Sequence, residues 1–190
     1  MNRSMFLRLE WGVSIALTAV ALLWGTMREL PFLKAPAPTM RDVALGAAAG
    51  ALLWLCIPLL RLSGAMRRVW EDLLVPFARQ FSVMDVLLIA SLSGVSEELL
   101  FRGVLLPEIG LVASSLVFGA LHALNAVYAL WAACTGAAFG LLAMERNSLM
   151  APIVAHATYN LGALLALRRW PLPPETPSAL EPIPPPGSPS

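Results

Sequence analysis

Long runs of apolar residues dominate the chain and define six segments with few charged positions. They span residues 11–27, 43–60, 83–106, 111–126, 128–144 and 148–167. Most are close to the roughly 20 residues that an α-helix needs to cross a bilayer. In lipid, a spanning segment must satisfy its own backbone hydrogen bonds, which a helix does within one segment. The pattern therefore predicts an all-α fold, a polytopic transmembrane helix bundle of about six membrane helices.

Composition agrees with a chain whose solvent is the bilayer. Of the 190 residues, 58% are hydrophobic and 13% are charged, and the mean hydropathy is +0.72. Soluble domains contain about 45–50% apolar and about 25% charged residues. The net charge of +1 lacks the basic excess typical of nucleic-acid binding, so we expect a lipid bilayer and no nucleic acid as partners.

The pattern divides the chain into four regions. Residues 1–60 hold two N-terminal transmembrane helices, and residues 83–167 hold a four-helix core. Residues 61–82 carry apolar and charged positions at helical spacing, which predicts an amphipathic interfacial helix that Pro76 bends or ends; an ordinary polar loop is the alternative. The last twenty residues contain nine prolines, so residues 168–190 are predicted to be a disordered tail.

The N-terminal segment also resembles a signal peptide, because Arg3 and Arg8 precede its apolar stretch. No small-x-small cleavage site follows, and we interpret the segment as a retained helix. With six crossings, eight Lys and Arg residues fall on the side of the termini: Arg3, Arg8, Arg61, Arg67, Arg68, Arg79, Arg168 and Arg169. The other side holds Arg28, Lys34, Arg41 and Arg146. The positive-inside rule then predicts a multi-pass protein of the inner membrane with both termini in the cytoplasm.

Several polar residues interrupt the last four segments. These residues are Glu97, Glu98, Arg102, His122, Asn125, His156 and Asn160, and they include both histidines of the chain. Ionisable side chains inside a membrane are rare and usually mark function. Each alone is compatible with an interhelical hydrogen bond, and Asn125 is best interpreted as a helix-end or turn residue. Together they predict a functional site.

Helical geometry separates the two adjacent glutamates. Glu98 and Arg102 are four residues apart, so they lie on one helix face and can form an ion pair. Glu97 points about 100° away and has no partner in its own helix. A carboxylate without a neutralising cation is available as a general base. We therefore predict that Glu98 is structural and Glu97 is chemical.

Depth along the helices brings these groups together. At 1.5 Å per residue, Glu97 lies about 14 Å and His122 about 16 Å from the loop near Pro107. His156 lies about 12 Å, and Asn160 about 18 Å, from the loop that ends near Ser148 on the same membrane face. The four residues are predicted to converge on one cavity that water enters from the Pro107 side, which the charge bias places in the periplasm.

Three motifs in this order resemble a known family. They are Glu97-Glu98-x-x-x-Arg102, Phe118-x-x-x-His122 and His156-x-x-x-Asn160. They resemble the motifs of the CPBP intramembrane endopeptidases, which include the Ras-converting CAAX prenyl protease and bacterial ABI-type proteins. The resemblance covers about residues 83–167. The short chain is also similar to sorting proteases called myxosortases.

The resemblance implies peptide-bond hydrolysis in the membrane. Glu97 would activate water with help from His122, while His156 and Asn160 would stabilise the oxyanion. Glu98 and Arg102 would fix the helix that carries the base, and Phe118 would orient the ring of His122. The resemblance leaves the mechanism open between a metal-free glutamic peptidase, which we favour, and a zinc enzyme with Glu97, His122 and His156 as ligands. No cofactor is therefore expected, with zinc as the alternative.

The expected partner is a membrane-bound protein or peptide substrate, such as a bacteriocin precursor or the C-terminal sorting helix of a surface protein. Two other classes of function remain open from the residues alone. A non-catalytic membrane binding or immunity protein of the same fold would tolerate the loss of Glu97. A proton-coupled transporter could use buried Glu and His as a relay, although the two halves of the chain show no inverted repeat.

Overall fold

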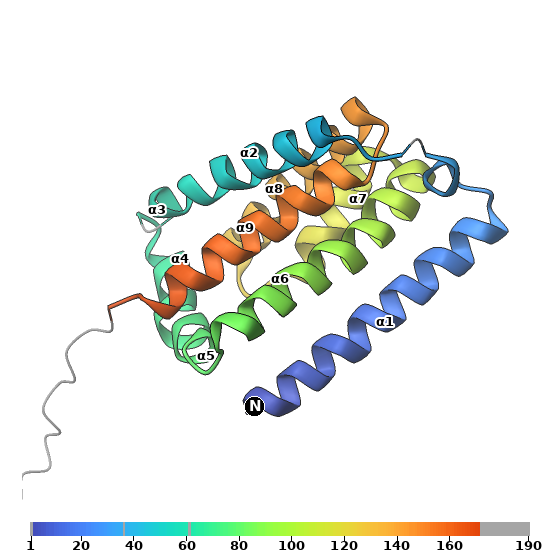
Figure 1. Cartoon of the computed structure of the whole chain (residues 1–190). Coiled ribbons are helices and arrows are strands. Elements are labelled where there is room, and N and C mark those ends of the chain that lie inside the picture. Colours follow the sequence, from blue (N-terminus) through green and yellow to red (C-terminus); the bar gives the residue numbers. More distant parts are fainter. Residues whose placement is uncertain (1, 36, 61, 172–190) are drawn as a thin grey trace, which may run out of the picture.

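The computed structural model describes residues 2–35, 37–60 and 62–171, and the regular elements in these ranges are all helical (Figure 1). In chain order the elements are α1 (Arg3–Met27), η1 (Pro31–Lys34), α2 (Met40–Leu55), α3 (Ile57–Leu60), α4 (Gly64–Val69), η2 (Trp70–Leu74), α5 (Val75–Ala78), α6 (Val83–Glu98), η3 (Leu99–Leu105), α7 (Leu106–Leu121), α8 (Ala126–Arg146) and α9 (Met150–Arg168). The predicted all-α bundle is confirmed. Most of the proline-rich tail lies outside the described residues.

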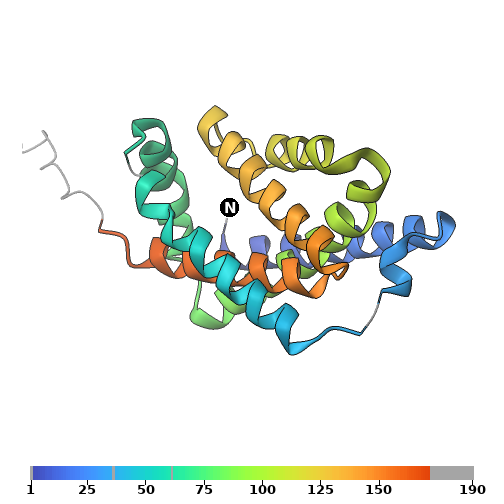
Figure 2. The same cartoon turned by 90° about the horizontal axis from the view of Figure 1, so that it is seen from above.

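Five helical stretches of the described residues are long and apolar enough to cross a membrane, where six segments were expected. The difference arises in Val83–Leu121, a stretch of 39 residues that contains the third expected segment and most of the fourth. At Gly110 the backbone leaves helical geometry, with φ +82° and ψ 170°. Glycine adopts this conformation readily because it has no Cβ. The chain bends there and α7 runs back (Figure 2), so the two expected segments are the two arms of this bend.

Helix α1 lies beside α6 and η3 in a register fixed by polar contacts. Arg3 forms an ion pair with Asp85 at 2.7 Å near the start of both helices. Farther along, the hydroxyl groups of Ser14 and Ser96 lie 3.4 Å apart, at the same sequence offset of 82. Asp85 also completes a capping box with Ser82, which explains why α6 begins at Val83.

Helices α2 and α9 pack closely because glycines face the contact. A Cβ atom added at Gly46 or Gly50 would collide with the carbonyl oxygen of Ala151 or Ala155. Gly94 of α6 is similarly close to Ala157 of α9, where an added Cβ would lie 3.2 Å from the alanine Cβ. These contacts hold α9, with its two polar motif residues, against both neighbouring helices.

The segment between the second and third expected membrane helices is helical. α4, η2 and α5 follow one another from Gly64 to Ala78, and Pro76 lies in the first turn of α5. Met66, Trp70 and Val75 are buried against the bundle in a cluster with partly buried Trp131 and Leu167. The helix therefore packs its apolar face on the bundle; its place at the membrane interface remains a prediction.

Both described ends of the chain lie at one end of the bundle, beside α5 (Figure 1). The rings of Phe6 in α1 and Phe77 in α5 make an edge contact with centroids 4.6 Å apart. Arg79, just after α5, donates a hydrogen bond to the carbonyl oxygen of Trp170, just after α9. This arrangement agrees with an even number of crossings.

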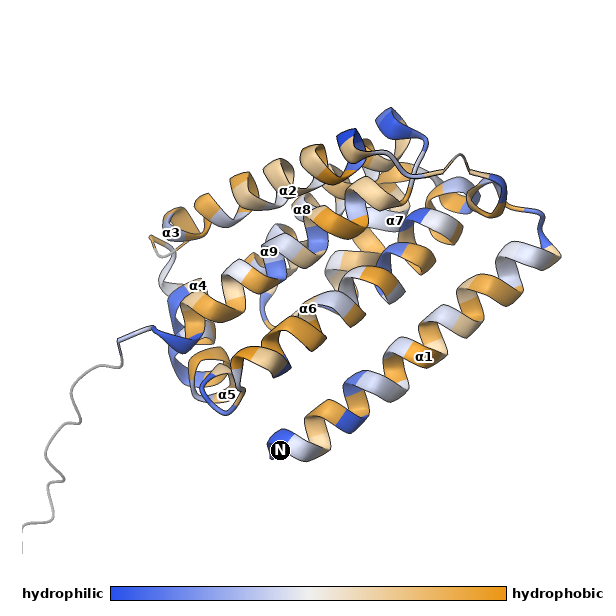
Figure 3. Cartoon of the chain, in the orientation of Figure 1, coloured by the Kyte–Doolittle hydropathy of each residue, from blue (hydrophilic) through white to orange (hydrophobic). Residues whose placement is uncertain are grey.

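Hydrophobic residues predominate along the lengths of the helices (Figure 3), and many of their large side chains are exposed. On α1, the side chains of Ile15, Leu23 and Met27 are each more than 60% exposed. Such a surface is stable in lipid and unfavourable in water. The protein is therefore a multi-pass membrane protein.

Candidate active site

Glu97, near the end of α6, faces His122, which ends α7. The carboxylate Oε2 of Glu97 lies 3.5 Å from the Nε2 of His122. The other ring nitrogen of His122, Nδ1, lies 2.8 Å from the carbonyl oxygen of Phe118. Because a carbonyl oxygen only accepts, we assign the proton of the neutral ring to Nδ1. The lone pair of Nε2 then points towards the carboxylate of Glu97.

Glu98 is fully buried and has two partners. Its Oε1 accepts a hydrogen bond from the Arg102 guanidinium at 2.7 Å, which confirms the ion pair expected from their spacing. The same Oε1 lies 2.7 Å from Nδ1 of His156 in α9. A second guanidinium nitrogen of Arg102 donates to the carbonyl oxygen of Gly136 in α8. Glu98 and Arg102 therefore tie α6, η3, α8 and α9 together.

Asn160 lies one turn after His156 on α9. Its side-chain Nδ2 donates one hydrogen bond to the hydroxyl of Ser93 in α6 at 2.9 Å. An amide nitrogen carries two N–H groups, so the other remains available to a bound molecule. Ser93 in turn donates to the carbonyl oxygen of Ile89, one turn earlier in its own helix.

Phe118 occupies the centre of an aromatic cluster around the polar residues. Its ring stacks on His122, with centroids 4.3 Å apart and planes 27° apart. It meets His156 edge-on at 6.0 Å, and the guanidinium carbon of Arg102 lies 4.8 Å from its centroid. Phe118 packs against the ring of His122, as the resemblance implied, and also contacts the cationic side of the site.

Four predicted site residues line one cavity. Glu97, His122, His156 and Asn160 face a space of about 460 Å³, which is within the usual range for a ligand site. Phe118 also lines this cavity. Glu98 and Arg102 lie outside its lining and connect the helices that form its walls. Asn125 stays apart from it: its side chain caps α8 and donates to the carbonyl oxygen of Ala65, as expected of a turn residue.

The cavity extends towards the opposite end of the bundle from the one expected. Its walls include Leu60, Met66, Trp70 and Leu167, which lie at the end that holds both termini. No described residue of the Pro107 end lines this cavity, so access from that side stays a prediction that the lining does not support. Depth measured along each helix placed the four residues correctly, but it could not reveal that α4 and η2 form the far wall.

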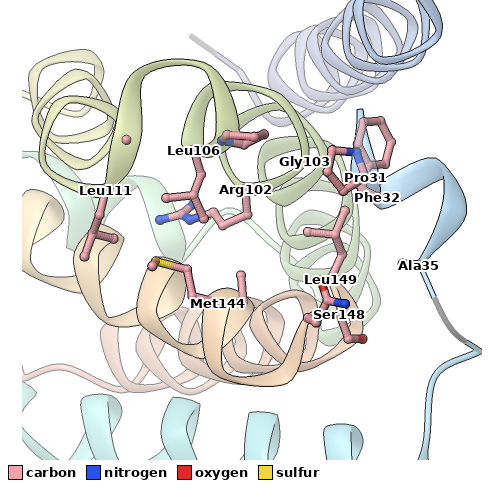
Figure 4. A pocket seen from close by; sticks show the side chains of 14 residues that line it. Pro31, Phe32, Ala35, Arg102, Gly103, Leu106, Leu111, Met144, Ser148 and Leu149 are labelled. Atoms are coloured by element: carbon pink, nitrogen blue, oxygen red, sulfur yellow. The ribbon is translucent and has the colours of Figure 1, made fainter. Parts of the chain in front are cut away.

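Arg102 and the Pro107 end line a separate, mostly apolar cavity of about 300 Å³ (Figure 4). Phe32, Gly103, Leu106, Met144 and Leu149 contribute to its walls. The described residues of its lining include no Asp, Glu, His or Cys. It therefore lacks the acid–base groups that hydrolysis requires, and the larger cavity is the candidate active site.

Several features of the site escaped the sequence analysis. The contact between His156 and Glu98 joins α9 and α6. Which residue His156 meets depends on how far each helix is rotated about its own axis. Directly after Glu98, the wider turns of the π-helix η3 begin, and such turns are frequent at functional sites. In the cavity wall, the indole nitrogen of Trp131 donates to the hydroxyl of Tyr159 at 2.7 Å. Periodicity alone gives no signal for these features.

The proposed zinc ligands are Glu97, His122 and His156. Each histidine uses Nδ1 in a protein contact and keeps Nε2 for another partner. Among the described residues, no three His, Cys, Asp or Glu side chains are grouped closely enough to hold a metal ion. The arrangement therefore does not fit a metal centre as it stands.

Comparison with protein families gives one match. Residues 79–162, somewhat under half of the chain, match the family described as type II CAAX prenyl endopeptidase Rce1-like. The matched region contains all seven residues of the three motifs. The resemblance to the CPBP and CAAX protease family is thereby confirmed, and the match supports a protease. No curated protein and no solved structure matches the chain.

Proposed function

We propose that the protein is an intramembrane endopeptidase that hydrolyses membrane-associated proteins or peptides, a proposal supported by the match of residues 79–162 to the Rce1-like family. The observation that carries the proposal is the shared cavity: Glu97 and His122 face each other there, beside His156 and Asn160. A base, a hydrogen-bonding partner for water and a donor for an oxyanion thus meet at one place.

In the proposed reaction, Glu97 accepts a proton from a water molecule whose oxygen bonds to the carbonyl carbon of the substrate. The electron pair of the C=O π bond moves to the carbonyl oxygen and forms an oxyanion. When the tetrahedral intermediate collapses, the C–N bond breaks and the nitrogen takes the proton from Glu97. His122 orients the water through Nε2, because Phe118 holds its other ring nitrogen.

Asn160 and His156 are the proposed stabilisers of the oxyanion. The amide of Asn160 has one N–H beyond the bond to Ser93, and a donor in a dry site stabilises developing negative charge. Since His156 directs Nδ1 to Glu98, its Nε2 can donate only when the ring is cationic. The contact with the Glu98 carboxylate also orients the ring of His156, which gives Glu98 a role beyond its pairing with Arg102.

The substrate we propose is a peptide segment already in the membrane, because the cavity walls are largely apolar and aromatic. A bacterial precursor peptide or a C-terminal sorting helix would have this character. The location in the inner membrane and the position of both termini in the cytoplasm are also proposals. The cavity would then open towards the cytoplasmic end.

A comparison of membrane proteomes tests the proposed function. Cells that produce the wild-type protein or Glu97→Gln are compared, with Glu145→Gln as control because Glu145 is exposed at the end of α8. We expect a membrane protein to persist as its longer form in the Glu97→Gln cells alone. Identical proteomes, with both variants present at equal amounts in the membrane, would contradict the proposal and favour a non-catalytic role.

A further inference from the structure

A third carboxylate faces the candidate active site from α1, outside the region that matches the protease family. Glu10 immediately precedes the apolar stretch that the sequence suggested as the first membrane segment. In the structure α1 already begins at Arg3, so Glu10 lies two turns inside the helix. It lines the same cavity as Ser93 and Glu97.

The register of α1 explains this position. The contacts of Arg3 with Asp85 and of Ser14 with Ser96 share one offset and lie on either side of Glu10. Glu10 is therefore level with the turn of α6 that holds Ser93, one turn before Glu97. Both contacts lock α1 against sliding, which keeps the Glu10 carboxylate at the cavity.

The carboxylates around the cavity differ in how their charge is balanced. Glu98 has Arg102 and His156 as partners, whereas Glu97 faces the neutral ring of His122 at 3.5 Å. Glu10 makes no hydrogen bond or ion pair with any described residue, and the described residues that line the cavity include no Lys or Arg. An ionised carboxylate without a partner is unfavourable at a largely apolar site. Either a proton or a positively charged group from a bound molecule would neutralise it.

Aromatic side chains provide a second feature that suits a cation. Tyr128, Trp131 and Tyr159 line the cavity together with Glu10. The faces of aromatic rings attract Lys and Arg groups, most strongly where water is excluded. A carboxylate and several aromatic rings in one cavity are the kinds of group that bind an ammonium or guanidinium group.

We propose that Glu10 is a specificity residue that binds a Lys or Arg side chain of the substrate near the bond to be cleaved. The reference to a cleaved bond rests on the proposed function. The site would select apolar segments that carry one positive charge over segments that are wholly apolar or acidic. It also gives α1 a part in substrate choice, while the residues of the matched region carry the chemistry.

Cleavage by the purified full-length protein in detergent tests the proposal. The probes are N-acetylated, internally quenched apolar peptides with a single Lys moved along the sequence, each paired with a Gln peptide. At one position, the wild type should prefer Lys over Gln by about tenfold in kcat/KM, as expected for one charged hydrogen bond. Glu10→Gln should lose this preference, Glu10→Lys should prefer a Glu peptide, and Glu145→Gln should match the wild type.

Two results would overturn the proposal. One is an unchanged preference for Lys in Glu10→Gln. The other is an equal loss of activity on all peptides with an altered pH profile, which would make Glu10 a proton partner of Glu97.

A binding measurement separates this proposal from the proposed function. Fluorescence anisotropy compares labelled Lys and Gln peptides on Glu97→Gln and on the double variant Glu97→Gln/Glu10→Gln. Tighter binding of the Lys peptide that disappears in the double variant supports the role of Glu10, even if the wild type cleaves nothing and the proposed hydrolysis fails. Equal affinity for both peptides in the single variant contradicts the role of Glu10, even if the wild type is active.

Discussion

Adjacent glutamates in α6 have separate surroundings, and this difference predicts separate effects of their removal. Glu97 lines the cavity and meets one histidine, whereas Glu98 is enclosed with Arg102 and His156. We expect Glu97→Gln to lower cleavage by at least about 100-fold, the usual minimum for a general base, and to leave thermal unfolding close to that of the wild type.

Glu98→Gln should instead destabilise the fold by about 3–5 kcal/mol, because it leaves the buried guanidinium of Arg102 without its counter-charge. Unfolding of both variants in detergent, followed by circular dichroism, measures the contrast. If the two variants unfolded at the same temperature, the assigned division between a chemical and a structural glutamate would be wrong.

The metal-free reaction is a prediction at the level of residues. Among the described residues, no three His, Cys, Asp or Glu side chains lie close enough together to hold a metal ion, and we expect the enzyme to work without a bound ion. Activity of the purified protein should therefore survive dialysis against a chelator. Stoichiometric zinc in elemental analysis, together with activity that returns only when zinc is added, would favour the metalloprotease mechanism.

The sequence predicted the roles of single helices better than contacts between them. The spacing of Glu98 and Arg102 predicted their ion pair because both belong to one helix. No pattern indicated that His156 pairs with Glu98, since that contact depends on the rotation of α9 against α6. Glu10 escaped notice because the apolar run begins one residue later, whereas the helix begins at Arg3.

At the scale of elements, α9 brings two site residues to the cavity through close packing on α2. Gly50→Ala should separate these helices, because the added methyl group would meet the Ala155 carbonyl and Thr158. Overpacking of this kind costs about 1–3 kcal/mol, and the displaced His156 should also reduce cleavage.

The matched control is Gly12→Ala in α1, where nothing lies within 4 Å of an added Cβ. This change should be neutral or stabilise the helix by up to about 1 kcal/mol. Thermal unfolding and cleavage rates of the two variants measure the effect. Equal behaviour of Gly50→Ala and Gly12→Ala would mean that the α2–α9 contact does not position the site.

Helices could be predicted where a long run of apolar residues defined them. They were harder to predict where the backbone departs from regular α-helical geometry. The bend at Gly110 joins two expected segments into one stretch of helix. The sequence predicted a loop near Pro107 between these segments, whereas the chain reverses at Gly110 with helix on both sides of it. The composition of η3 likewise gave no indication that its turns are those of a π-helix.

For the whole molecule, the position of both ends beside α5 predicts which loops share a side of the membrane. Leu62, between α3 and α4, and Met40, at the start of α2, lie at opposite ends and are 86% and 81% exposed. In a protein without Cys56 and Cys134, we expect an impermeant thiol reagent on intact spheroplasts to label Met40→Cys and to spare Leu62→Cys.

Both positions should be labelled once the membrane is broken, which controls for reactivity. The reverse pattern in intact spheroplasts would place the termini outside and invert the topology inferred from the eight positive charges on that side. It would also move the mouth of the cavity to the periplasm.

Hydrolysis of a peptide bond by Glu97 in this cavity is tested most directly with purified enzyme and purified substrate. The precursor that persists in Glu97→Gln cells is incubated in liposomes with wild-type protein or with Glu97→Gln, and the products are weighed by intact-mass spectrometry. The wild type should yield two fragments whose masses add up to that of the precursor plus one water, and Glu97→Gln should leave the precursor intact. Equal cleavage by both proteins, or an intact precursor with both, would contradict hydrolysis by Glu97.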